Sequence, residues 1–352
     1  MPYRDFPLEY PPGALLSFVL PEAARQLSPV RLSYAFWFRV EVLALWAPML
    51  FATAWTLRRL GANRAHVWLS LVVTAIFPLL LGNVSAARYD VWPALLTALA
   101  VAALVAQRPR LACALIGAGI VAKVYPVVLL PIALVVLWRN DRVRGVLEGA
   151  GAALGVALAG FGLFLVRAPE GLWHGMWRQL SRPLQIESSA ASLWALGHVV
   201  VGLHVHPVKS YGSDNIVTHG SSLAASVSGV LVAAALVAVW VRFARGQAGS
   251  EEIVVAAAAA VAGYLAFNKV FSPQYLIWLL PLVVLVRDRL GQLAIGLFVV
   301  AAVLTQTWEP FLYPELLRYG TLECVLLVLR DVLVVTVFAL LLRGHRGAAA
   351  ET

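Results

Sequence analysis

Long apolar runs separated by short basic connectors are the feature that most constrains the fold of this chain. Hydrophobic residues make up 61% of the 352 and charged residues only 13%, about half the charged share of soluble domains. The mean hydropathy is +0.83, and a helix that spans a bilayer needs roughly 20 apolar residues. The runs therefore predict an all-α, polytopic transmembrane protein with about 11 membrane segments, at residues 35–57, 65–81, 91–106, 111–122, 126–138, 145–166, 220–242, 252–268, 276–286, 290–307 and 321–342.

Arginines in alternate connectors give the chain a predicted orientation in the cell membrane. They are Arg58, Arg59, Arg64, Arg108, Arg110, Arg139, Arg142, Arg144, Arg242, Arg245, Arg287, Arg289, Arg343 and Arg346. By the positive-inside rule these connectors and the C-terminus are cytoplasmic. The predicted regions are an outer-face loop with an interfacial helix, N-terminal transmembrane helices, a long outer-face loop with interfacial helices, and C-terminal transmembrane helices with a short cytoplasmic tail, at 1–34, 35–166, 167–219 and 220–352.

Three predicted spans are too short to cross a membrane. At 1.5 Å per residue, residues 111–122, 126–138 and 276–286 fall well below a hydrocarbon core of about 30 Å. Broken helices at membrane depth are tolerated where they line a protein-enclosed or wet cavity. The breaks after Val121 and Asn268 therefore predict one site on the outer face.

Each of these two breaks carries a lysine with a proline shortly after it. A lysine in an apolar stretch costs about 2.5–3.5 kcal/mol at a helix centre, so an anionic partner is expected nearby. We predict that Lys123 and Lys269 bind a lipid-linked phosphate or pyrophosphate, and that Tyr125, Gln274 and Tyr275 bond substrate hydroxyls.

Two further segments on the same side carry candidate residues. In the turn 82–90, Arg88 and Asp90 either pair with each other or face the substrate, where a guanidinium suits a phosphate. The N-terminal segment is either a membrane-surface loop or the source of a general base, and its acidic residues are Asp5 and Glu9.

Several classes of function find no support in the sequence. It contains no nucleotide-binding signature, no clustered basic face for nucleic acid and no cysteine spacing typical of a metal site. His204 and His206 could be a metal pair, but no third ligand lies at ligand spacing. We therefore predict no metal, no cofactor and no nucleic-acid partner.

Four segments together resemble glycosyltransferase family 87, the polyprenyl-phosphate-mannose-dependent mannosyltransferase group of the GT-C superfamily. They are Pro2-Tyr3-Arg4-Asp5-Phe6 with Glu9-Tyr10-Pro11-Pro12, Gly82-Asn83 with Arg88-Tyr89-Asp90, Lys123-Val124-Tyr125-Pro126, and Ser272-Pro273-Gln274-Tyr275. Each segment is short, and their order and spacing carry the resemblance.

The resemblance implies a multi-helix GT-C fold whose outer-face loops bind a polyprenyl-phosphate sugar and a lipid or glycan acceptor. It implies inverting hexosyl transfer, with mannose as the expected sugar, assisted by an acidic residue of the first outer loop. It also implies a first helix and a following Asp that would lie upstream of Met1, so the base is either that Asp or one of Asp5 and Glu9. Two alternatives remain on the sequence alone: a transporter or flippase of lipid-linked saccharides, and an inactive assembly subunit.

Overall fold

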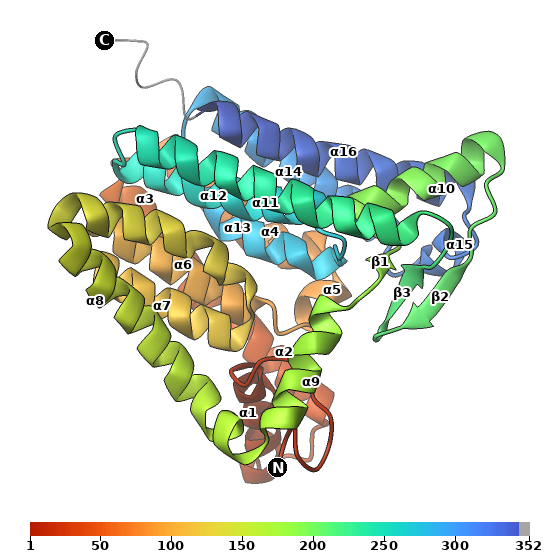
Figure 1. The fold of residues 1–352 in the computed structure, drawn as a ribbon, viewed down its shortest axis with the longest axis horizontal. Coiled ribbons are helices and arrows are strands. Elements are labelled where there is room, and N and C mark those ends of the chain that lie inside the picture. Colours follow the sequence, from red (N-terminus) through yellow and green to blue (C-terminus); the bar gives the residue numbers. More distant parts are fainter. Residues whose placement is uncertain (345–352) are drawn as a thin grey trace.

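The computed structural model describes residues 1–344 of the chain, and helices form most of it (Figure 1). Six helical stretches are long and apolar enough to cross a membrane: Tyr34–Arg59 (α2, Tyr34–Ala44, and α3, Trp46–Arg59), Tyr125–Arg167 (η1, Tyr125–Leu129, and α8, Leu130–Arg167), α11 (Ser221–Arg245), α12 (Ser250–Phe267), α14 (Arg289–Trp308) and α16 (Thr321–Gly344). Five shorter apolar stretches accompany them: α4 (Arg64–Leu80), α6 (Val91–Val105), α7 (Pro109–Ala122), α10 (Ser189–Val201) and Pro273–Val283 (η2, Pro273–Tyr275, and α13, Leu276–Val283). The all-helical membrane fold is confirmed, while the count of about 11 spans stays a prediction. Arg346 lies outside the described residues.

The remaining elements are short, and in Figure 1 α1 and α9 lie at the bottom while the strands and α15 lie on the right. They are α1 (Ala14–Leu27), α5 (Asn83–Ala86), α9 (Pro169–Leu180), α15 (Tyr313–Leu316) and the strands β1 (Leu184–Gln185), β2 (Pro207–Ser210) and β3 (Ser213–Ile216). The strands form an antiparallel sheet in the order β1-β3-β2. Sequence analysis missed this sheet, because strands this short show no readable alternation. In α9, Trp173 and Trp177 are exposed, as expected of an interfacial helix.

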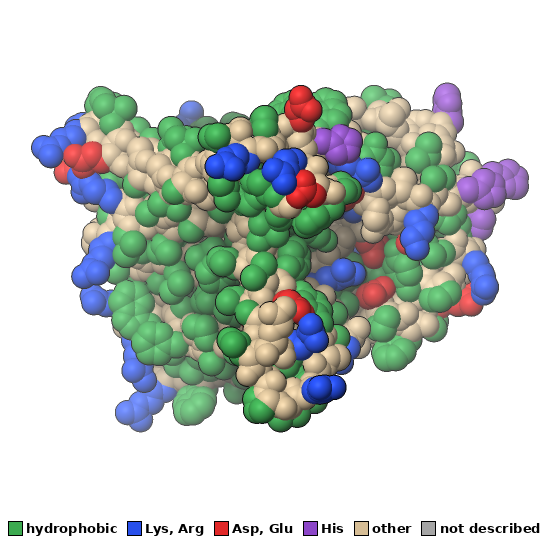
Figure 2. Space-filling view, turned by 90° about the horizontal axis from the view of Figure 1, so that it is seen from below, with side chains coloured by type: hydrophobic (Ala, Val, Ile, Leu, Met, Phe, Trp, Pro, Cys, Tyr) green, Lys and Arg blue, Asp and Glu red, His purple; other side chains and the backbone are tan. Residues whose placement is uncertain are grey.

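Helix α8 reverses direction at Arg142, whose φ of 52° and ψ of −138° are not helical. Its two arms match the two predicted spans on either side of a basic connector. The basic connectors also contact one another: Arg139 donates to the carbonyl of Ala244 at 2.8 Å, and Arg110 pairs with Asp141 at 2.8 Å. In Figure 2, Lys and Arg side chains gather along the left edge, at the end where α8 turns in Figure 1. The predicted cytoplasmic connectors therefore share one end of the protein.

The core lies where α6, α12 and α13 pack together. Every residue of α13 is buried, and the alanines from Ala256 to Ala260 in α12 are at most 2% exposed. Small side chains let neighbouring helices approach closely. A helix as short as α13 is tolerated because it lies inside the protein, with other helices around it rather than lipid.

Candidate active site

A cavity of about 880 Å³ is lined in part by the turns 87–90, 123–125 and 268–275, which lie at the opposite ends of their helices from the basic connectors. Figure 2 shows a recess with basic and acidic side chains between apolar surfaces. Of the nine predicted site residues eight line the cavity, namely Glu9, Arg88, Asp90, Lys123, Tyr125, Lys269, Gln274 and Tyr275. Asp5 does not line it: its side chain is 47% exposed and pairs with Arg4 at 2.7 Å.

The two predicted helix breaks bring their lysines to this cavity. Helix α7 ends at Ala122, and Lys123 is extended, with φ −165° and ψ 133°. Helix α12 ends at Phe267, and the extended Asn268 leads into the return helix η2–α13. The predicted breaks are confirmed. Each exposes its polar residues to the cavity because the chain leaves the helix there.

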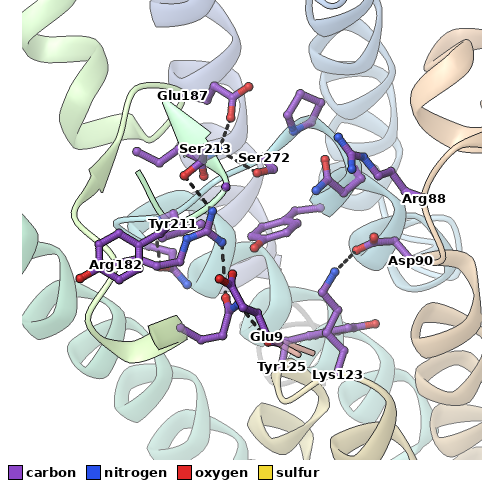
Figure 3. A pocket seen from close by; sticks show the side chains of 18 of the residues that line it. Glu9, Arg88, Asp90, Lys123, Tyr125, Arg182, Glu187, Tyr211, Ser213 and Ser272 are labelled. Atoms are coloured by element: carbon purple, nitrogen blue, oxygen red, sulfur yellow. Dashed lines mark hydrogen bonds and ion pairs between the residues drawn. The ribbon is translucent and has the colours of Figure 1, made fainter. Parts of the chain in front are cut away.

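Lys123 lies in a box of aromatic rings closed by a carboxylate (Figure 3). Its Nζ is 2.6 Å from Oδ1 of Asp90, and the centroids of the Tyr89, Trp278 and Tyr275 rings lie 4.8, 4.9 and 5.3 Å away. The indole N–H of Trp278 donates to the same Oδ1 at 2.6 Å. The charge of Lys123 is therefore already compensated by the protein.

An aromatic column continues from this box. The ring of Trp278 stacks between Tyr125 at 4.1 Å and Tyr275 at 3.8 Å. The Tyr125 hydroxyl lies 2.9 Å from the Thr97 hydroxyl of α6, so it is engaged within the protein rather than free for a substrate. The amide of Gln274 makes no hydrogen bond within residues 1–344 and remains available to a ligand.

Three other cations line the cavity without a carboxylate partner among residues 1–344. Arg88 makes no hydrogen bond there, while Arg182 donates to Ser213 Oγ at 2.8 Å and Lys269 donates to the Leu180 carbonyl at 2.7 Å. Burial lowers the pKa of Lys269, which reflects the cost of holding its charge without a counter-ion. These three cations, none of them in a direct ion pair within residues 1–344, offer positive charge and hydrogen-bond donors to an anion.

Glu9 is held at the cavity by two contacts from helix α9. Its carboxylate pairs with Arg178 of α9 at 2.8 Å, and Gln179 donates to its carbonyl at 3.0 Å.

The N-terminal segment also packs directly against the end of α7, where the Gly13 N–H donates to the Val121 carbonyl at 2.8 Å. A Cβ at position 13 would lie 2.8 Å from the same carbonyl, so only glycine allows this close approach.

Sequence analysis assigned no role to the acidic residues on another wall of the cavity, Glu187, Asp214 and Glu309. Glu187 is 4% exposed and accepts a hydrogen bond from the Gln185 amide. Asp214 accepts one from the Tyr313 hydroxyl at 3.1 Å, and burial raises the pKa of Glu309. Arg182 was also given no role. The available signal was the segment 182–188, in which Arg182, Gln185, Glu187 and Ser188 lie among three apolar residues.

The buried carboxyl of Glu187 makes stability depend on pH. Burial raises its pKa to about 8; Glu309 and Asp214 add to the shift, whereas Arg330 and Arg182 oppose it. Between its ordinary pKa of 4.5 and about 8, the unfolded chain loses this proton while the folded chain keeps it, so stability falls as pH rises.

We therefore expect Glu187→Gln to unfold at a temperature that changes less with pH than that of the wild type. From pH 5 to pH 8, the melting temperature of the wild type should fall by a few degrees relative to this variant. Thermal unfolding in detergent at both pH values measures the difference. Parallel pH dependence in the two proteins would show that Glu187 ionises normally when folded.

The residues proposed as possible metal ligands lie apart from the cavity. His204 and His206 are exposed and do not line it. Within residues 1–344, no three His, Cys, Asp or Glu side chains form a group that could hold a metal ion.

Comparison with protein-family models gives a match. The model of glycosyltransferase family 87 matches residues 8–273, which include Glu9, Arg88, Lys123 and Lys269 of the cavity wall. A search of curated protein sequences finds no match to this chain. Glu309 lies beyond the matched residues and completes the same cavity from the C-terminal part of the chain.

Proposed function

Because the chain belongs to glycosyltransferase family 87 and is therefore a multi-pass membrane glycosyltransferase, we propose that it moves a hexose from a polyprenyl-phosphate donor to a lipid or glycan acceptor. We propose mannose as the sugar, inversion at the anomeric carbon, and an active site on the outer face of the cell membrane.

One observation carries the proposal: three cations without carboxylate partners and a set of carboxylates share one cavity. A lipid-linked sugar monophosphate presents an anion and several hydroxyls within a short distance. Arg88, Arg182 and Lys269 offer charge-assisted hydrogen bonds to the phosphate oxygens. Carboxylate, amide and phenol groups on the remaining wall suit hydroxyls.

The proposed reaction is a single displacement. The acceptor oxygen forms a bond to the anomeric carbon as the bond from that carbon to the phosphate oxygen breaks, and the electron pair leaves with polyprenyl phosphate. Glu9 takes the proton of the acceptor hydroxyl, since its carboxylate reaches the cavity and is oriented by Arg178. The cations stabilise the charge that develops on the departing phosphate.

Replacing any one of the three uncompensated cations by methionine should weaken donor use. A lost charge-assisted hydrogen bond is worth roughly 10- to 100-fold, so KM for polyprenyl-phosphate mannose should rise by about that factor in Lys269→Met. The assay measures transfer of radiolabelled mannose, with Arg31→Met as the control because Arg31 is exposed and lies outside the cavity. Unchanged donor kinetics in Arg88→Met, Arg182→Met and Lys269→Met would refute the phosphate site.

Cysteine labelling tests which face carries the site. The native Cys113 and Cys324 are buried, so a cysteine at Lys209 or Gln247, both exposed, gives the signal. We expect an impermeant reagent to label Lys209→Cys in intact cells and Gln247→Cys only after permeabilisation, because Gln247 lies in a basic connector. The opposite pattern would invert the proposed orientation.

A further inference from the structure

The buried segment Leu184–Ser188 forms a wall of the cavity that neither the phosphate nor the proton transfer uses. Glu187 and Gln185 both line the cavity and are only 4% and 3% exposed. The Gln185 amide N–H₂ donates to the Glu187 carboxylate and, at 2.8 Å, to Ser272 Oγ. Its Oε1 has no partner within residues 1–344, and a buried acceptor left unpaired costs free energy unless a ligand fills it.

We propose that Glu187 and Gln185 form the subsite that binds the hydroxyls of the transferred sugar. A sugar hydroxyl can donate to the free Oε1 of Gln185 and exchange hydrogen bonds with the Glu187 carboxyl. A site built to bond hydroxyls discriminates strongly against a ligand that lacks them, because its buried polar groups then stay unpaired. The inference rests on the proposed function, since it assigns the sugar end of the donor.

The position of this wall fits a sugar rather than the lipid phosphate. Glu309 and Asp214 act on Glu187 through their negative charges, and Figure 3 places Glu187 apart from Arg88 and from the Asp90–Lys123 pair. These negative charges repel a phosphate, whereas the Glu187 carboxyl, whose raised pKa keeps it protonated at neutral pH, can donate to a sugar hydroxyl and accept from one. Arg182, whose positive charge also acts on Glu187, is the uncompensated cation expected nearest the junction between sugar and phosphate.

Arg330 holds this subsite from within the transmembrane helix α16. Its guanidinium is fully buried, donates to the main-chain carbonyl of Glu187 at 2.6 Å, and stacks over Phe271 at 4.1 Å. It also pairs with Asp331 at 3.0 Å. A buried charge in a membrane helix is costly and commonly functional, and here it fixes the backbone that presents Glu187. Arg330 is thus a positioning residue.

The test compares the affinities of the full-length protein for polyprenyl-phosphate mannose and for polyprenyl phosphate, which lacks the sugar and has one more ionisable oxygen. The measured quantity is the ratio of the two affinities, with the wild-type ratio as the reference. Glu187→Leu, which replaces the carboxyl by an apolar side chain of similar size, should reduce the relative preference for the mannosyl lipid about 10-fold while leaving the affinity for polyprenyl phosphate unchanged. Gln185→Leu should act in the same direction, and Arg330→Lys should reduce the preference less. Lys269→Met should instead lower the affinities for both lipids by the same factor.

The control is Glu170→Gln, an exposed carboxylate of α9 outside the cavity, for which both affinities should equal the wild-type values. The sugar subsite is refuted if Glu187→Leu lowers the affinities for both lipids by the same factor or lowers neither. A wild-type protein that binds neither lipid refutes the proposed donor instead, so the two failures are distinguishable.

Discussion

Lys123→Met is expected to lose about 3–5 kcal/mol of folding stability, the typical cost of leaving one member of a buried ion pair without its partner. The Asp90 side chain is 2% exposed and that of Lys123 is 15% exposed, so solvent cannot replace the missing ammonium. The Trp278 indole would remain as a donor to Asp90 but cannot neutralise its charge. Thermal or denaturant unfolding of the purified protein in detergent measures the loss.

The double variant Lys123→Met/Asp90→Asn tests whether the unpaired charge of Asp90 causes this loss of stability. It removes the orphaned charge and keeps an oxygen that can accept from Trp278, so most of the lost stability should return. Lys209→Met is the matched control, because Lys209 is exposed in β2. A single variant as stable as the wild type but unable to bind polyprenyl phosphate would make Lys123 a phosphate ligand, as the sequence predicts.

Glu9→Gln is expected to lower kcat for sugar transfer by about 10²- to 10⁴-fold, the usual contribution of a proton-transfer group. The amide keeps the size of the side chain and can still bond Arg178, so the fold and donor affinity should be retained. Single-turnover transfer from polyprenyl-phosphate mannose measures the chemical step, and binding of polyprenyl phosphate checks the site.

Asp5→Asn provides the comparison within the same segment. Its carboxylate lies outside the cavity against Arg4, so kcat should remain within about twofold of the wild type. Equal losses in the two variants would indicate disturbance of the N-terminal segment rather than proton transfer. Full activity in Glu9→Gln would assign the base to another carboxylate.

The parts of the site that sequence analysis predicted share a simple physical origin. A lysine in an apolar stretch costs free energy to bury in any fold, and a proline a few residues later interrupts the helix. Lys123 and Lys269 therefore mark helix breaks regardless of the surrounding structure. The same reasoning leads to a cavity, because broken helices must be enclosed or wet. This reasoning does not identify the anionic partner of each lysine. In the structure Lys123 forms an ion pair with Asp90 and is therefore not unpaired.

Other parts of the site depend on contacts between distant segments. Glu187 and Arg330 are far apart in sequence, and only packing of the long loop on α16 brings the Glu187 carbonyl to the guanidinium. The sheet that carries Asp214 pairs strands of two to four residues, too short for a periodic signal. Neither feature follows from local propensity, because each is set by tertiary contacts.

The separation of acidic and basic walls in the cavity has a consequence for the reaction barrier. Glycosyl transfer passes through a state in which the sugar ring carries partial positive charge, like an oxocarbenium ion, while the leaving group gains negative charge. With the sugar against the wall that carries Asp214 and the phosphate among Arg88, Arg182 and Lys269, the fixed charges create an electric field directed from phosphate to sugar. Such a field lowers the energy of the charge-separated state relative to the intact donor, and it needs no rearrangement of the protein as the bond breaks.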